Sequence, residues 1–126
     1  MNKGLWTVQI LLGMAFVMGG GMKLVTSVEV LAADMVWVTH VPALAVKGIG
    51  FVELLGACGL ILPSLLRIKP WLTSLAALGL LLTMLGATAT HIALGESNMI
   101  VAPLVLGCLA AFVAWGRYKV APIEAA

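Results

Sequence analysis

Four long apolar stretches, separated by short segments that contain proline or glycine, constrain this chain more than any other feature. They cover residues 5–24, 43–62, 71–94 and 99–115. Each is close to the roughly 20 residues that an α-helix needs to cross about 30 Å of hydrocarbon. The sequence therefore predicts an all-α membrane protein, built as a bundle of four transmembrane helices.

Composition supports a membrane protein and excludes other classes. Of the 126 residues, 63% are hydrophobic and only 10% are charged, which is more apolar surface than a soluble domain of this length can bury. The length predicts one transmembrane domain over residues 1–120, followed by a C-terminal tail over residues 121–126. The net charge of +2 is spread over helix ends and loops, so we expect no nucleic-acid partner.

The basic residues are unevenly distributed between the two sides of the predicted bundle. One side holds five of the seven, namely Lys3, Arg67, Lys69, Arg117 and Lys119. Trp6, Trp71 and Trp115 lie at the same boundary, as in an aromatic belt. Because cytoplasmic loops carry an excess of lysine and arginine, we expect both termini to be cytoplasmic.

The connection between the first two stretches, residues 25–42, is long enough to have structure of its own. Its apolar residues recur at helical spacing, whereas Glu29 and Asp34 lie off that stripe. The stripe consists of Val28, Leu31, Ala32 and Met35. The pattern predicts a short amphipathic segment in the outer membrane interface.

Glu53 lies in the middle of the second apolar stretch. A carboxylate at the centre of a membrane helix costs roughly 2.5–3.5 kcal/mol on insertion scales. Eight strongly apolar neighbours between Ile49 and Leu62 return about 0.3–0.6 kcal/mol each, so the helix should still insert. An ionisable residue kept at this cost is a candidate functional residue, and a structural tie between helices is the rival interpretation.

Small residues indicate which way Glu53 points. Gly50, Gly56 and Ala57 lie three or four residues from Glu53 and therefore on the same helix face. Since small residues mark helix contacts in membranes, Glu53 should point into the bundle. The third stretch carries a similar stripe, for which we also expect a helix contact: Gly79, Thr83, Gly86 and Thr90.

Two further ionisable residues belong to the same half of the bundle as Glu53. Lys23 lies near the outer end of the first stretch, and His91 near the outer end of the third. A cluster of Lys23, Glu53 and His91 would pair the carboxylate and let a proton enter from outside. In the alternative interpretation, Lys23 extends to the lipid head groups and His91 bonds a backbone carbonyl.

The sequence contains no motif for several other kinds of catalytic or binding site. There is no Ser/His/Asp set, no phosphate-binding glycine loop and no array of metal ligands. Cys58 and Cys108 lie within predicted spans without ligand spacing, so we expect buried, inert thiols rather than a disulfide. His40 is in a loop, and we do not expect it to meet His91 as a haem ligand.

Several motifs together resemble one known family. Residues 20–24 read GGMKL, residues 48–63 read GIGFVELLGACGLILP, residues 70–72 read PWL, and residues 87–91 read ATATH. In this order they are similar to the motifs of the DoxX-like membrane proteins. The resemblance implies a four-helix membrane bundle with Lys23, Glu53 and His91 as its polar centre. Named members are associated with quinone-linked oxidation, including thiosulfate:quinone oxidoreductase, usually beside other subunits.

The function that follows as a hypothesis is that of a small membrane subunit of a quinone-linked oxidoreductase system in the bacterial inner membrane. Glu53 would give or take a proton, Lys23 would tune its charge, and His91 would orient a quinone or similar lipophilic ligand. The resemblance supplies no redox cofactor. One alternative is a non-catalytic partner that grips another membrane chain or a second copy. Another is a proton-coupled exporter, which the lack of an acidic residue in the first stretch disfavours.

Overall fold

Four long helices form the body of the protein in the computed structural model, which describes residues 1–33 and 35–125. The first three are α1 (Asn2–Val25), α3 (Ala43–Leu66) and α4 (Trp71–Ala93). The fourth, α5 (Val101–Trp115), follows the 3-10 turn η2 (Ser97–Met99) and continues into the π-helical turn η3 (Gly116–Val120). All four spans are long and apolar enough to cross a membrane, which confirms the predicted all-α membrane fold.

The second span is longer than the sequence predicted. The predicted stretch ended at residue 62, before Pro63, but α3 continues through Pro63 to Leu66 and is followed by Arg67, which has a left-handed backbone (φ 56°). A proline inside a helix removes one backbone hydrogen bond and crowds the carbonyl of the preceding turn, but packing can outweigh this cost. Ser64, directly after it, is buried against the neighbouring helices, and this packing holds the last turn in place.

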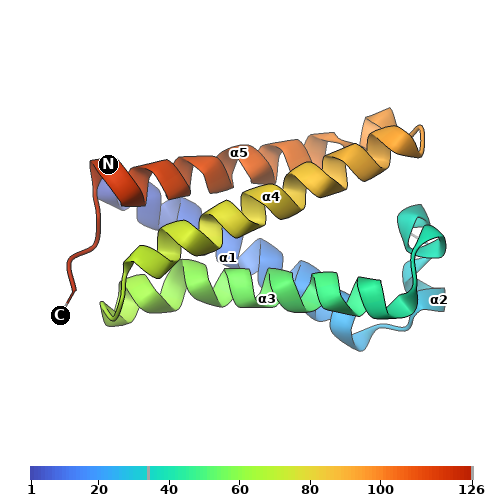
Figure 1. Ribbon diagram of the computed structural model, residues 1–126, viewed down its shortest axis with the longest axis horizontal. Coiled ribbons are helices and arrows are strands. Elements are labelled where there is room, and N and C mark those ends of the chain that lie inside the picture. Colours follow the sequence, from blue (N-terminus) through green and yellow to red (C-terminus); the bar gives the residue numbers. More distant parts are fainter. Residues whose placement is uncertain (34, 126) are drawn as a thin grey trace.

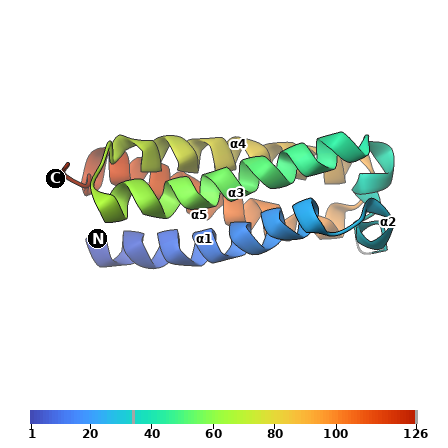
Figure 2. The same ribbon diagram turned by 90° about the horizontal axis from the view of Figure 1, so that it is seen from below.

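The helices pack as two pairs, α1 with α3 and α4 with α5, and the pairs join mainly through α3 and α4 (Figures 1 and 2). Two glycines let α1 and α3 approach closely, since a Cβ atom on Gly20 would lie 2.6 Å from the carbonyl oxygen of Gly50. The buried core lies between the pairs and consists of Leu12, Phe16, Ala57, Leu60, Ala77, Leu80, Met84, Ala110 and Val113.

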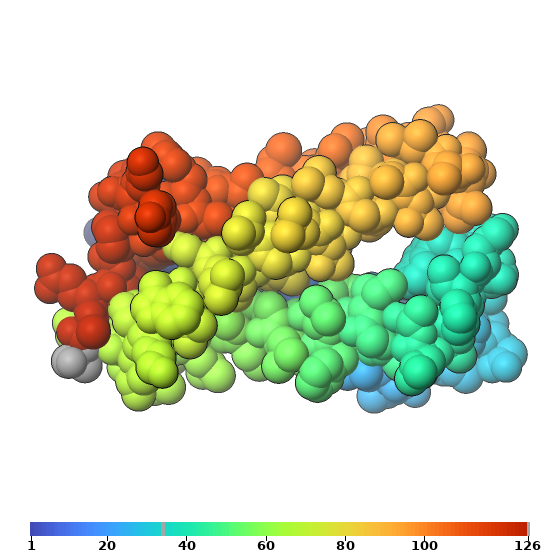
Figure 3. Space-filling view, in the orientation of Figure 1, coloured from blue at the N-terminus to red at the C-terminus, as the bar shows by residue number. Residues whose placement is uncertain are grey.

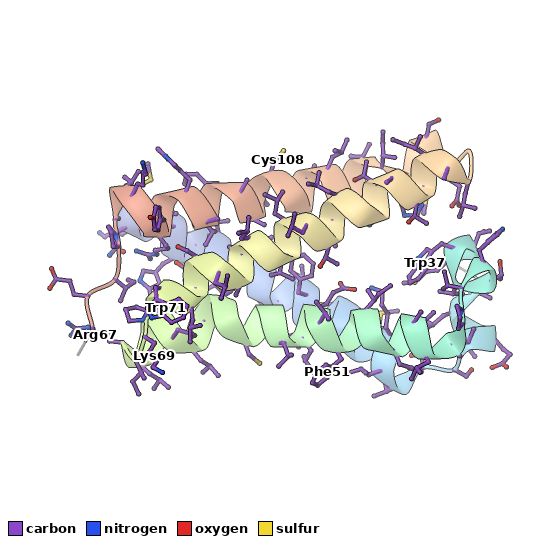
Figure 4. The ribbon with its side chains drawn as sticks, viewed as in Figure 1. Trp37, Phe51, Arg67, Lys69, Trp71 and Cys108 are labelled. Carbon is purple, nitrogen blue, oxygen red and sulfur yellow. The ribbon has the colours of Figure 1, made fainter. Side chains whose placement is uncertain are left out.

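The two ends of the bundle differ. We call one the terminal end, because both chain termini and the connection between α3 and α4 lie there (Figure 1). The five basic residues of the predicted cytoplasmic side are all on elements of this end, where Figure 4 labels Arg67, Lys69 and Trp71. We call the other the loop end, which carries α2 (Val28–Leu31), η1 (Val36–His40) and η2.

At the loop end, the predicted amphipathic segment is divided into two short helical pieces, α2 and η1. Leu31 and Val38 from these pieces are buried against Val46 of α3, where they form a second, smaller hydrophobic cluster. The apolar stripe therefore packs on the bundle itself. Asp34, which belonged to the predicted segment, lies outside the described residues.

The α4–α5 pair diverges from α3 toward the loop end. In Figure 1, α4 begins beside α3 at the terminal end and runs away from it toward the loop end. The space-filling view shows a hollow between α4 on one side and α3 with η1 on the other (Figure 3).

Candidate functional site

The hollow between the diverging helices is a cleft of about 910 Å³. A volume of 300–1,000 Å³ is typical of sites for small organic molecules, which are mostly apolar with a few polar groups. Trp37 of η1 lies at the mouth and extends toward the opening (Figure 4). The other apolar residues of the wall include Ala15, Phe16, Ile49, Val52, Met84, Ala87, Met99, Pro103 and Leu106.

Lys23 and Glu53 form an ion pair on the wall of this cleft. The distance from Lys23 Nζ to Glu53 Oε1 is 2.7 Å, and the side chains are only 12% and 6% exposed. Glu53 thus points into the bundle, and Lys23 reaches it instead of extending past the helix end. Pairing makes two charges tolerable in a medium of low dielectric constant, where either alone would be strongly disfavoured.

Two glycines make room for this pair. A Cβ atom on Gly19 would lie 3.4 Å from Glu53 Oε2, and one on Gly50 would lie 2.7 Å from Lys23 Cβ. A side chain at Gly50 would therefore push α1 and α3 apart, whereas one at Gly19 would come into contact with the carboxylate. The small residues beside Glu53 serve the helix contact that the sequence predicted, and they also hold the ion pair at the α1–α3 interface.

His91 lies on the wall of the same cleft but pairs with a different residue. Its Nδ1 is 3.3 Å from Oε1 of Glu96, and the two side chains are 13% and 20% exposed. Among the described residues, it has no hydrogen bond or ion pair with Lys23 or Glu53. The predicted three-residue cluster is thus two separate pairs that border one cleft.

Glu96 was not predicted from the sequence as a site residue. It follows His91 by five residues, across a turn in which Gly95 has a positive φ of 75°. That turn brings Glu96 back to the helix end, where its backbone N–H donates to the carbonyl oxygen of His91 at 2.8 Å. A glycine after a helix commonly has this left-handed conformation. Gly95 could therefore have indicated from the sequence that the chain turns back toward the helix end here.

The small residues of α4 form a wall of the cleft and not the predicted helix contact. Thr83, Gly86 and Thr90 line the cleft, and a Cβ atom on Gly86 would meet no atom within 4 Å. The hydroxyl groups of Thr83 and Thr90 donate to carbonyl oxygens of their own helix, each at 2.9 Å. The predicted helix contact was wrong, because Gly79 is exposed and the cleft separates α4 from α3 at Gly86.

Two other ionisable residues near the loop end, Lys47 and His40, do not line the cleft. Lys47 donates from Nζ to the carbonyl oxygens of Leu24 and Thr26 at 3.2 and 2.6 Å, which satisfies groups left free near the end of α1. His40 is exposed and pairs locally, with Nδ1 3.3 Å from the carbonyl oxygen of Val36. No group of histidine, cysteine and carboxylate side chains suited to a metal ion is found within residues 1–33 and 35–125.

The two cysteines are not buried in the bundle as expected. Cys58 and Cys108 are free thiols on outward faces of their helices (Figure 4 labels Cys108). In a membrane these faces would meet lipid, because they are the parts of the spans that no neighbouring helix covers. The prediction of buried thiols was therefore wrong, since both lie outside the core.

The terminal end contains a buried polar network that the sequence analysis did not identify. Gln9 is completely buried, and its amide donates to the carbonyl oxygen of Leu60 at 2.6 Å. Ser64 lies 3.5 Å from the same amide and shares a hydrogen bond of 2.7 Å with Thr73. These contacts tie α1, α3 and α4 together at this end.

Arg117 connects α5 to the same network. Its Nε donates to Gln9 Oε1 and its Nη1 to Asn2 Oδ1, each at 2.6 Å, while its Cζ lies 5.4 Å from the ring centre of Trp6. The side chain is only 4% exposed, although the sequence analysis used it only as a charge that sets orientation. Within the described chain, Nη2 is the one nitrogen of this guanidinium without a partner.

The model of the DoxX-like family matches residues 7–113, a region that includes Lys23, Glu53, His91 and Glu96. Arg117 lies beyond the matched region. No match was found among curated proteins or among solved structures.

Proposed function

Because the chain belongs to the DoxX-like family, we propose that it is a small integral membrane subunit of a quinone-linked oxidoreductase system. In this proposal, a quinone or similar lipophilic ligand binds in the cleft at the loop end. One observation carries the proposal, namely that the Lys23–Glu53 ion pair lies on the wall of a largely apolar cleft of about 910 Å³. An ion pair that served only to join two helices would need no such space beside it.

The residues of the cleft fit such a ligand. Apolar side chains such as Phe16, Val52 and Leu106 would surround a ring and its tail. Lys23 would donate a hydrogen bond to an oxygen of the head group, and Glu53 would accept or return a proton at that position. A bound quinone would itself supply the electron chemistry, and the chain would contribute binding, orientation and proton exchange.

We further propose that the cleft opens into the outer half of a bacterial inner membrane. The five basic residues and three tryptophans of the terminal end support a cytoplasmic location for that end. The loop end would then lie outside. A ligand dissolved in the bilayer would enter sideways between α3 and α4, where the hollow in Figure 3 opens.

Binding of decylubiquinone to the purified protein in nanodiscs tests this proposal. We expect Glu53→Gln to weaken binding at least about tenfold, because the carboxylate that holds Lys23 in place is lost. The matched control is Glu29→Gln, which removes an acidic group on α2 that does not line the cleft. Equal affinities of wild type and Glu53→Gln would contradict the proposal.

A second candidate function is that of a non-catalytic membrane partner, which an unpartnered glycine on α4 favours. Gly79 is exposed, and a Cβ atom there would meet no atom within 4 Å. Small residues allow another helix to approach closely in a membrane. A stoichiometric partner that is lost in Gly79→Leu, together with an empty cleft, would support this function over the first.

A further inference from the structure

Glu96 determines which nitrogen of His91 is left for a ligand. A carboxylate only accepts hydrogen bonds, so His91 Nδ1, 3.3 Å from Glu96 Oε1, is assigned the proton. The backbone hydrogen bond from Glu96 to the His91 carbonyl holds the carboxylate beside the ring. When the ring is neutral, its Nε2 then carries a lone pair and acts as an acceptor.

Neighbouring groups at this end of the cleft are also acceptors. The hydroxyl group of Thr90 donates to the carbonyl oxygen of Gly86, so its free capacity is to accept. The Glu96 carboxylate can only accept. The donors that line the cleft, Lys23 Nζ and the Trp37 indole, belong to the α1 wall and to the mouth, and they can serve either redox form of a ligand.

A quinone and its reduced form differ in what they offer to such a wall. The carbonyl oxygens of a quinone only accept hydrogen bonds, whereas the hydroxyl groups of a hydroquinol also donate. A quinone oxygen placed against His91 Nε2 would leave two acceptors facing each other in an apolar cleft. A hydroquinol hydroxyl at the same place would form a hydrogen bond.

We propose that the cleft prefers a lipophilic hydroquinol, or a comparable phenol, over the oxidised quinone, and that Glu96 is the positioning residue that creates this preference through His91. The proposal rests on the proposed function, since it names the form of the ligand that the same cleft selects. It assigns Glu96 no contact with the ligand. His91 is the residue that recognises the hydroxyl group.

The tautomer of His91 can be measured without any ligand. Nitrogen-15 NMR of the histidine rings is recorded at about pH 8.5, well above the ordinary histidine pKa of about 6.5. We expect the Nδ1–H tautomer for His91 in the wild type and a shift toward Nε2–H in Glu96→Ala. His40, which has its own local partners, provides an internal reference in each spectrum.

The preference itself is measured by titrating decylubiquinol and decylubiquinone separately into the protein in nanodiscs at the same pH. The wild type should bind the quinol at least about fivefold more tightly, as one added hydrogen bond predicts. The ratio should fall to about one in Glu96→Ala and in His91→Phe, which keeps a ring of similar size. Glu29→Ala, on α2 and away from the cleft, should keep the wild-type ratio.

The outcomes separate this inference from the proposed function. Equal binding of the two forms by the wild type would overturn the redox preference but leave the cleft as a ligand site. A wild-type ratio that survives in both Glu96→Ala and His91→Phe would show that other residues create it, and would overturn the role of Glu96. If neither form binds the wild type, both proposals are wrong.

Discussion

The two ends of the bundle bury polar side chains in opposite ways. At the terminal end, Gln9, Ser64, Thr73 and Arg117 form a chain of hydrogen bonds that joins the helices. At the loop end, the Lys23–Glu53 pair borders a cleft of about 910 Å³. The comparison teaches that burial of a polar residue does not by itself mark a ligand site. A ligand site is indicated when polar side chains line an open cleft, as Lys23 and Glu53 do at the loop end.

Small residues on α3 and α4 explain where the bundle closes and where it opens. A Cβ atom on Gly56 would lie 2.5 Å from Leu80, and one on Gly59 would lie 2.6 Å from Ala76, so the two helices touch here. Farther along α4, a Cβ atom on Gly86 would meet nothing within 4 Å. The helices therefore touch toward the terminal end and separate toward the loop end.

The largest effect should come from disrupting the polar network at the terminal end. Arg117→Leu should lower the free energy of unfolding by about 3 kcal/mol, because Gln9 loses its charged donor while it remains buried, and Asn2 loses a hydrogen bond. Unfolding in mixed micelles with increasing sodium dodecyl sulfate measures it. The control is Lys119→Leu, which changes an exposed residue near Arg117 and should alter the free energy of unfolding by less than about 0.5 kcal/mol. A small loss for Arg117→Leu would show that the network contributes little.

At the loop end, the Lys23–Glu53 ion pair should be dispensable for folding but necessary for ligand binding. Lys23→Met alone should cost about 2 kcal/mol, since Glu53 is left buried without its cation. The double variant Lys23→Met with Glu53→Leu should recover stability to within about 1 kcal/mol of the wild type. The same double variant should not bind decylubiquinone. Wild-type affinity in the double variant would show that the pair is only a structural tie.

Filling the cleft should affect binding and leave the fold intact. Gly86→Leu should lower ligand affinity about tenfold, which corresponds to about 1.4 kcal/mol. Its stability should not fall, because the position has free space and leucine favours helix more than glycine does. Gly79→Leu, two turns earlier on α4 and outside the cleft, should keep the wild-type affinity. Loss of affinity in both variants would point to a general effect on α4.

The smallest effect on stability should be the difference between two serine-to-alanine variants near the terminal end. Ser64→Ala should cost about 1 kcal/mol, because Ser64 shares a hydrogen bond of 2.7 Å with Thr73. Ser74→Ala should be neutral or stabilising, since Ser74 Oγ is buried without a partner in the described chain. Thermal unfolding of both variants in the same detergent compares them. Equal losses would mean that the Ser64 hydrogen bond adds nothing.

The sequence predicted the four spans and the inward direction of Glu53 because both depend on local pattern. Hydropathy over about 20 residues identifies a span, and helical spacing identifies a face. The Lys23–Glu53 pair could also be predicted from the sequence, since both residues lie in the same half of adjacent spans. These features need no knowledge of how the helices cross.

The cleft and the Gln9–Arg117 network depend on the rotation and crossing of helices far apart in the sequence, whereas the His91–Glu96 pair depends only on the local turn at Gly95. Gln9 and Arg117 are 108 residues apart, and a basic residue at a helix end is explained equally well by membrane orientation. The divergence of α4 from α3 follows from where small residues permit contact. The sequence analysis expected contact at Gly86, where the structure has open space.

Native mass spectrometry tests most directly whether the loop end holds a ligand. The wild type and Gly86→Leu are purified from the same membranes under mild conditions, and the small molecules bound to each are identified. We predict that the wild type retains a lipophilic molecule of the quinone class and that Gly86→Leu has lost it. The same molecules at the same occupancy in both proteins, or none in the wild type, would contradict a ligand site in this cleft.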